Sequence, residues 1–334
     1  MVSGVGPEET LEELGIDVVA DRPGVGQNMM DHVLVGPTYA VGVTTHNSLA
    51  DPEFLANAIE QYETNRTGML TNSGGDVAAF LKLPASSVSN STFADLQTSF
   101  PEDWPNIEWL VLDAYFGAGT DTGSGISDNK QYVASSVGLV STFSRGNITI
   151  NSADMADDPV ISPNWLTDPR DQDMAIAAFR YGRALFDAKV IQHVVESEAF
   201  PGRNITSDEQ IWDIITQSAN SVYNAAGTCK MGQLADPMAV VSSTGKVIGV
   251  EKLRLVDASA FPILPPGQPI GTVCKCMMFL NHSFQPCHIF SFRAFPPPPF
   301  FFFFPFEVPP VYIMLILNFL SFSCHSCTRR ENCR

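Results

Sequence analysis

The chain has 334 residues, of which 45% are hydrophobic and 16% are charged. This length and composition suffice for two domains with buried cores, and they exclude a disordered acidic polymer. Nineteen lysine and arginine residues against 36 aspartate and glutamate residues leave a formal net charge of −17. Because no cluster of basic residues interrupts this acidic charge, the sequence argues against nucleic acid and against an anionic membrane surface as partners.

The predicted elements begin with a short helix and a strand. Pro7 and Gly15 are typical of the start and the stop of a helix, and the run 16–19 is typical of a strand. Apolar residues at helical spacing predict two longer helices, over 53–65 and 170–187. Alternating apolar residues between turns predict strands over 77–83, 107–115, 131–143 and 147–151.

A third long helix is predicted from its first turn. Ser207 and Gln210 have the spacing of a capping box, and the helix that they begin extends to about residue 220. The strands come in groups and not in strict alternation with helices. This order predicts an α+β fold that contains an antiparallel sheet.

The last part of the chain, 274–334, differs from the rest in composition. It holds six of the seven cysteines, so only Cys229 remains for the main body, and a disulfide framework there is excluded. Its proline and phenylalanine runs offer no periodic face, and we predict that it is disordered and binds no metal. The apolar run 311–323 is shorter than the roughly 20 residues of a membrane helix, so a tail-anchored membrane protein is the least favoured reading.

The start of the chain shows no basic region followed by an apolar stretch, so no signal peptide is predicted. Five Asn-x-Ser/Thr sequons are present, at Asn65, Asn90, Asn147, Asn204 and Asn281. They fit a complete protein that is secreted and glycosylated, and they also fit chance in a chain rich in serine and asparagine. Both readings stay open at this point.

Three groups of motifs follow one another along the chain. The first is Ser-Gly-Val-Gly-Pro at 3–7 with Pro-Gly-Val-Gly-Gln-Asn-Met-Met-Asp-His at 23–32, and the second runs from Ser-Arg-Gly-Asn at 144 to Asp-Pro-Arg-Asp at 168–171. The third joins Ala-Gly-Thr-Cys-Lys-Met-Gly at 226–232, Leu-Arg-Leu-Val-Asp-Ala-Ser at 253–259 and the proline-rich 262–269. In this order and spacing the set resembles the glucose-methanol-choline (GMC) family of FAD-dependent alcohol oxidoreductases.

The resemblance implies an α+β fold: a GMC-like substrate domain with an antiparallel sheet and helices, plus the returning part of an incomplete FAD-binding domain. The implied division is an FAD-domain remnant with a flavin-lid segment at 1–35, a substrate-binding domain at 36–206, a C-terminal FAD-domain segment with the active-site motifs at 207–273, and the aberrant tail at 274–334. The sequence contains no Gly-x-Gly-x-x-Gly loop after a strand, the element that holds the pyrophosphate of a dinucleotide. We therefore expect weak retention of FAD.

Five positions are implied to contact FAD. From the residues alone, the glycines before Asn28 allow close approach of a backbone and Asn28 can present an amide, although a plain tight turn explains them equally well. The run 253–259 reads as a buried strand that ends in a carboxylate, where α/β ligands bind, and a solvated aspartate competes with that reading. The resemblance implies that the cofactor-binding residues are Asn28, Asp257, Ala258, Pro269 and Ile270.

Alcohol oxidation by a flavin needs hydride transfer and removal of the hydroxyl proton, so a base should lie beside the carbinol. The resemblance places this histidine at position 224 and a second histidine or asparagine at 268, where the chain has Asn224 and Gln268. An amide orients a hydroxyl by hydrogen bonding but does not accept its proton at neutral pH. His32 is interpreted as a structural residue, and His46 and His193 lie outside any motif.

Two hypotheses remain. The leading one is the C-terminal part of an oxidoreductase that acts on CH–OH groups of a small-molecule alcohol, with activity impaired at positions 224 and 268, and with oxygen or a quinone as electron acceptor. The alternative is a catalytically silent, glycosylated binding paralogue that kept the cleft and lost the base.

Overall fold

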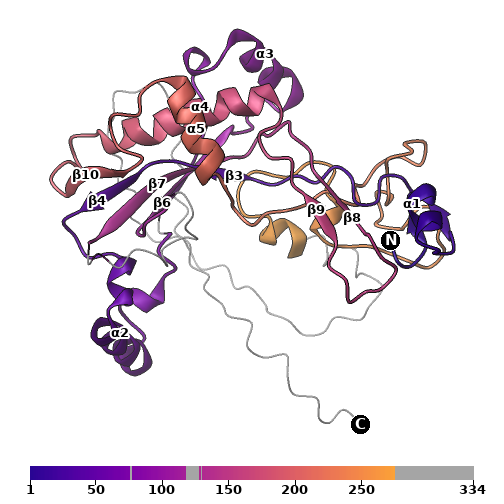
Figure 1. Ribbon diagram of the computed structural model, residues 1–334, viewed down its shortest axis with the longest axis horizontal. Helices are drawn as coiled ribbons and strands as arrows, with labels where there is room; N and C mark the ends of the chain where they lie inside the picture. The colour runs from indigo at the N-terminus through magenta and orange to yellow at the C-terminus, as the bar shows by residue number, and fades with distance from the viewer. Residues whose placement is uncertain (76, 118–127, 129, 275–334) are drawn as a thin grey trace, which may run out of the picture. The chain divides into compact units, whose positions relative to one another are not determined.

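The computed structural model describes residues 1–75, 77–117, 128 and 130–274 (Figure 1). Contacts divide the chain into two compact units, which we describe separately. Unit 1 comprises Met1–His32, Thr142–Thr167 and the described residues from Tyr223 onward, and unit 2 comprises Val33–Ser141 and Asp168–Val222. These units are defined by contacts, so the domain boundaries expected from the sequence stay a prediction.

Unit 2 is built on a seven-stranded sheet in which every pairing is antiparallel. The long central strand β7 pairs with β6 over Leu139 to Ala134, while β3 and β4 pair with its two ends. The remaining strands extend this arrangement, with β10 beside β4, β11 beside β3 and β5 beside β6. The strands are β3 (Val33–Val35), β4 (Thr38–Val41), β5 (Val77–Leu81), β6 (Ile107–Leu112), β7 (Tyr132–Leu139), β10 (Val195–Phe200) and β11 (Asn220–Ser221).

Helix α4 (Pro169–Phe186) packs on one face of this sheet. Ser135 of β7 donates from its hydroxyl to the Gly182 carbonyl at 2.8 Å, and the ring of Tyr39 stacks on Phe186 with centroids 4.5 Å apart. The other helices of unit 2 are α2 (Pro52–Asn65), α3 (Asn90–Ser99) and α5 (Asp208–Ser218), with short 3-10 turns η1 (His46–Ala50), η2 (Met69–Thr71) and η3 (Ala85–Ser87).

The helix ends of unit 2 follow from local side-chain chemistry. Asp51 caps α2 and Asp168 caps α4, each just before a proline in the first turn. The capping box of α5 is present in full, because the Ser207 hydroxyl accepts from Gln210 N and the Gln210 side chain accepts from Ser207 N. The expected long helices and the α+β class with an antiparallel sheet are thus confirmed.

Unit 1 consists mainly of irregular chain. Its labelled elements are β1 (Val5–Gly6), α1 (Glu8–Glu13), β2 (Ala20–Asp21), β8 (Asn147–Thr149), β9 (Val160–Ser162) and the 3-10 turn η4 (Ala258–Ala260), and residues 270–274 are also helical. Strands β1 and β2 pair in parallel, and β8 and β9 pair antiparallel.

Backbone contacts between distant segments hold unit 1 together. Gly26 N donates to the Thr228 carbonyl at 2.7 Å, and Ile148 N donates to the Gly26 carbonyl at 2.7 Å. A Cβ atom at Gly26 would lie 2.0 Å from the Ile148 oxygen, and its φ is +82°. Only glycine fits where these three segments meet.

Two expected strands of unit 1 are wrong. Residues 16–19 form no strand, and pairing begins only at β2. The stretch 253–257 also forms no strand: Lys252 has a φ of 61°, Leu253 is 45% exposed, and only an isolated bridge joins Arg254 to Lys246. A left-handed residue directly before an exposed leucine turns the chain away from a regular ladder, and apolar content alone does not reveal this.

Several expectations concern the ends and the surface of the chain. Of the described helices, none is both long and apolar enough to cross a membrane. The expectations for the tail from 275 onward, including the run 311–323, lie outside the described residues. Among the sequons, the asparagines at 65, 90 and 204 are exposed, and their glycosylation stays a prediction.

Candidate functional site

A buried carboxylate joins two segments of unit 1 that lie far apart in the sequence. The same oxygen of Asp31, Oδ1, accepts from His32 N at 2.9 Å and from Asn224 N at 3.0 Å. Directly beside this clamp, Met30 and Ala226 exchange backbone hydrogen bonds of 2.8 and 2.9 Å. The motif segment that ends at His32 is therefore fixed against the segment that carries Asn224.

The Asn224 side chain lies inside this cluster. Its Nδ2 is 3.1 Å from His32 Nδ1 and 3.4 Å from the Gly267 carbonyl oxygen. Asn224 is 4% exposed and His32 is 1% exposed. Of the two residues predicted at catalytic positions, Asn224 is thus buried beside a histidine, whereas Gln268 follows Gly267 in the chain and is exposed.

His32 is the residue that the sequence interpretation left out of the site. Burial lowers the pKa of its imidazole to about 4, so the ring is neutral near neutral pH. Its Nε2 atom is buried and has no hydrogen-bond partner in the structure. The signal that could have identified it was its place in a motif, since residues 23–32 and 226–232 belong to the same family resemblance.

Two of the five expected cofactor residues, Asn28 and Ala258, hydrogen-bond to Gly227, and a third, Asp257, precedes Ala258 in the chain. Asn28 Nδ2 donates to the Gly227 carbonyl at 3.2 Å, and Gly227 N donates to the Ala258 carbonyl at 3.1 Å. A Cβ atom at Gly227 would lie 2.7 Å from the Asn28 oxygen. Asp257 Oδ1 accepts from Ser259 N at 2.8 Å at the start of η4. These residues form a glycine-lined backbone cradle that presents an amide and a carboxylate, which is donor and acceptor chemistry that fits a flavin nucleotide.

The other two expected cofactor residues have a different environment. Val273 N donates to the Pro269 carbonyl at 2.9 Å, and Ile270 is 72% exposed. Their assignment to the flavin ring stays a prediction.

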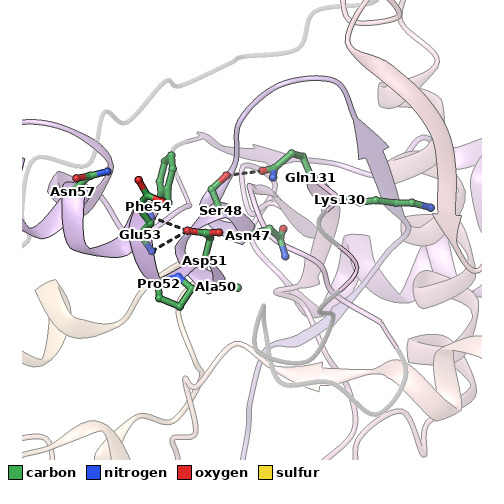
Figure 2. A pocket seen from close by; sticks show the side chains of 10 residues that line it. All are labelled: Asn47, Ser48, Ala50, Asp51, Pro52, Glu53, Phe54, Asn57, Lys130 and Gln131. Atoms are coloured by element: carbon green, nitrogen blue, oxygen red, sulfur yellow. Dashed lines mark hydrogen bonds between the residues drawn. The ribbon is translucent and has the colours of Figure 1, made fainter.

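Unit 2 contains a hollow of about 680 Å³ between η1 and the start of α2 (Figure 2). Three of its polar side chains serve local structure: Ser48 donates to Gln131 Oε1 at 3.0 Å, and Asp51 accepts from two backbone amides at the start of α2. None of the expected site residues lines it. Across the described residues, no group of three or more His, Cys, Asp and Glu side chains has a metal-binding arrangement.

Comparison with known proteins identifies relatives of the chain. Residues 142–275 match the family model described as GMC oxidoreductase. The chain is 46% identical to versicolorin B synthase stcN of Emericella nidulans over 275 residues, which are 82% of this chain and 42% of that protein. It is 43% identical to patulin synthase of Aspergillus clavatus over 279 residues, which are 82% of this chain and 44% of that protein. The chain thus spans less than half the length of these curated relatives.

Solved structures agree with this relationship. An FAD-dependent oxidoreductase from Chaetomium thermophilum matches 84% of this chain and 51% of its own, with a TM-score of 0.68 and 26% identity. The formate oxidase of Aspergillus oryzae matches 85% of this chain and 52% of its own, with a TM-score of 0.75; at 23% identity this likeness shows the fold. FAD is the cofactor of the family. The chain is therefore similar to GMC oxidoreductases, and its residues 142–275 match the C-terminal domain of that family.

Proposed function

We propose that this chain contributes the substrate-facing part of an FAD-dependent oxidoreductase that acts on a CH–OH group of a small organic molecule. The observation that carries the proposal is the clamp at Asp31, which fixes Asn224 and His32 side by side where two family motifs meet. In the family resemblance, position 224 is the place of the base. A buried polar pair at that place is suited to holding the oxygen of a carbinol.

The residues divide into two roles in this proposal. Asn28, Asp257 and Ala258 would hold FAD, which when bound supplies a hydride acceptor. Asn224 and Gln268 would orient the hydroxyl, and the enclosed position of Asn224 would keep water from that oxygen. Relatives named for versicolorin B and for patulin support a small organic substrate. Oxygen and a quinone are the two electron acceptors that we propose.

A flavin titration of the full chain tests the cofactor half of the proposal. Because the sequence has no pyrophosphate loop, FAD and riboflavin are expected to bind with dissociation constants that agree within about threefold, measured by quenching of flavin fluorescence. Asn28→Asp removes the amide donor, and we expect it to weaken both ligands roughly fivefold, the worth of about one hydrogen bond.

Asn164→Asp is the matched control for this variant. Asn164, like Asn28, has a positive φ and donates from Nδ2 to a backbone carbonyl of unit 1, at Arg145. Failure of both flavins to bind, or equal weakening by the control, would contradict the proposed role of Asn28.

The second candidate function is a catalytically silent binding protein, and the amides at 224 and 268 favour it. With FAD in excess over the chain, anaerobic stopped-flow mixing with alcohols separates the two functions: the silent protein leaves the flavin oxidised. A positioned base contributes roughly 10²–10⁴ in rate. Asn224→His is therefore expected to raise the rate of flavin reduction far more than it changes substrate affinity. An unchanged rate would show that position 224 is not where the catalytic base is missing.

A further inference from the structure

The partners of the Asn224 amide settle which of its atoms is the nitrogen. One side-chain atom faces both the Gly267 carbonyl oxygen, at 3.4 Å, and His32 Nδ1, at 3.1 Å. A carbonyl oxygen only accepts hydrogen bonds, so the atom that faces it must be the donor, Nδ2. Turning the amide over would place Oδ1 against the Gly267 oxygen, and two acceptors would meet in a buried space.

The same contact determines the tautomer of His32. Since Nδ2 donates to Nδ1, the Nδ1 atom carries no proton, and a neutral imidazole then carries its proton on Nε2.

The Nε2 atom is buried and without a partner in the structure. A buried N–H without an acceptor costs about 1–3 kcal/mol, and nearly all such groups in folded proteins are paired. We infer that His32 Nε2–H is a ligand-binding donor, which hydrogen-bonds to a carbonyl-type oxygen of a bound molecule. The ligand class rests on the proposed function, which offers two sources of such an oxygen: the carbonyl product of alcohol oxidation and the flavin ring.

This inference changes what the cluster does chemically. In this tautomer His32 cannot take up the proton of an alcohol at Nε2, because that atom already carries one. It can instead stabilise negative charge that develops on an oxygen. Asn224 acts through His32 as a positioning residue, since its Nδ2 keeps the proton away from Nδ1.

Nitrogen NMR of the unmodified full chain, labelled with ¹⁵N-histidine, tests the tautomer without flavin or turnover. We expect His32 in the Nε2–H form, with its signals assigned from their loss in His32→Gln. His46 is the internal control, because its Nδ1 lies 2.6 Å from Asp113 Oδ2 and must therefore carry a proton. Detection of a proton on His32 Nδ1 would overturn the inference, even if flavin binds as proposed.

A second variant tests the cause of the tautomer. Asn224→Asp replaces the donor that faces Nδ1 by an acceptor, and it is expected to move the proton of His32 to Nδ1 while His46 stays unchanged. Persistence of the Nε2–H form in this variant would show that Asn224 does not position the proton.

Two carbonyl probes identify the source of the acceptor. Benzaldehyde represents the substrate side and lumiflavin the cofactor side. One of them is expected to shift the Nε2–H signals of His32 and to bind about tenfold more weakly to His32→Leu, while His32→Gln, which keeps an N–H donor, retains most of the affinity. If neither probe moves the His32 signals, the donor role is wrong.

Discussion

The two units of this chain reach a stable fold by different routes. Unit 2 has a seven-stranded sheet with α4 packed on one face, and its helices begin at capping residues visible in the sequence. In the described part of unit 1 the longest element is the six-residue α1, and contacts such as Gly26 with Ile148 hold distant segments together. The comparison teaches that regular hydrogen-bonded elements carry most of unit 2, whereas in unit 1 contacts between distant irregular segments carry the fold, and such contacts also fix the segments of the candidate site.

The largest effect is expected where backbones of unit 1 touch. Gly26→Ala would place a methyl group 2.0 Å from the Ile148 oxygen at a φ of +82°. Overpacking and the left-handed conformation together should lower the free energy of unfolding by about 4 kcal/mol. Urea unfolding measures this, and Gly15→Ala is the control, because Gly15 also has a positive φ but no atom lies near its added Cβ. Its cost should be about 1–2 kcal/mol, and equal losses would break the comparison.

The clamp at Asp31 should give the next effect. Asp31→Ala leaves the buried amides of His32 and Asn224 without their shared acceptor, which should cost roughly 3 kcal/mol. Asp31→Asn keeps an acceptor oxygen and should cost much less. Hydrogen exchange of the His32 and Asn224 amides measures directly whether these hydrogen bonds persist. If the amides stay protected in Asp31→Ala, another group holds these segments together.

Each unit contains a buried group whose pKa is shifted by its burial, and the two groups respond to pH with opposite sign. Burial lowers the pKa of His32 in unit 1 to about 4 and raises the pKa of Glu108 in unit 2 to about 7. Between pH 4 and 6.5 the unfolded chain binds a proton at His32 that the folded chain lacks, so this group makes stability rise with pH. Between pH 4.5 and 7 the folded chain keeps a proton on Glu108 that the unfolded chain loses, so this group makes stability fall with pH.

Two variants separate these contributions. Relative to the unmodified chain, the unfolding free energy of His32→Gln should decline as pH rises from 4.5 to 6.5, and that of Glu108→Gln should increase. Each difference has a ceiling of about 3 kcal/mol, the value of shifts of roughly 2.5 pKa units. Denaturant unfolding across this pH range measures both differences. If the unfolding free energies of the two variants changed with pH in the same direction relative to the unmodified chain, the opposite pKa shifts of His32 and Glu108 would be contradicted.

The smallest effect is expected at a helix cap of unit 2. Ser207→Ala removes the hydroxyl that accepts from Gln210 N, at a cost of about 1 kcal/mol. Hydrogen exchange should show the loss in α5 and leave the amides of His32 and Asn224 as protected as before. A loss of protection at these unit 1 amides would show that the two units do not respond independently.

The regular part of the fold could be predicted because its signals are local. Apolar residues at helical spacing predicted the two long helices α2 and α4, and Ser207 with Gln210 predicted the start of a third. Helical spacing then gives the face that packs. The same reasoning was wrong for 253–257, where the left-handed Lys252 turns an apolar stretch away from a strand.

The candidate site could be predicted only in part. Asn224 and Asn28 were identified through the family resemblance, but His32 was interpreted as a structural residue. No residue near His32 in the sequence indicates that its ring lies against Asn224. His32 and Asn224 are 192 residues apart and meet through Asp31.

Sequence by itself determined the helices, the α+β class, the family resemblance and the amide at position 224, since each follows from residue types at short range or from motif order. Tertiary structure alone decided that His32 lies against that amide and which of its nitrogens carries the proton. The reason is physical: a tautomer is set by the donor or acceptor that faces each nitrogen, and here the acceptor at Gly267 and the donor at Asn224 come from a distant part of the chain.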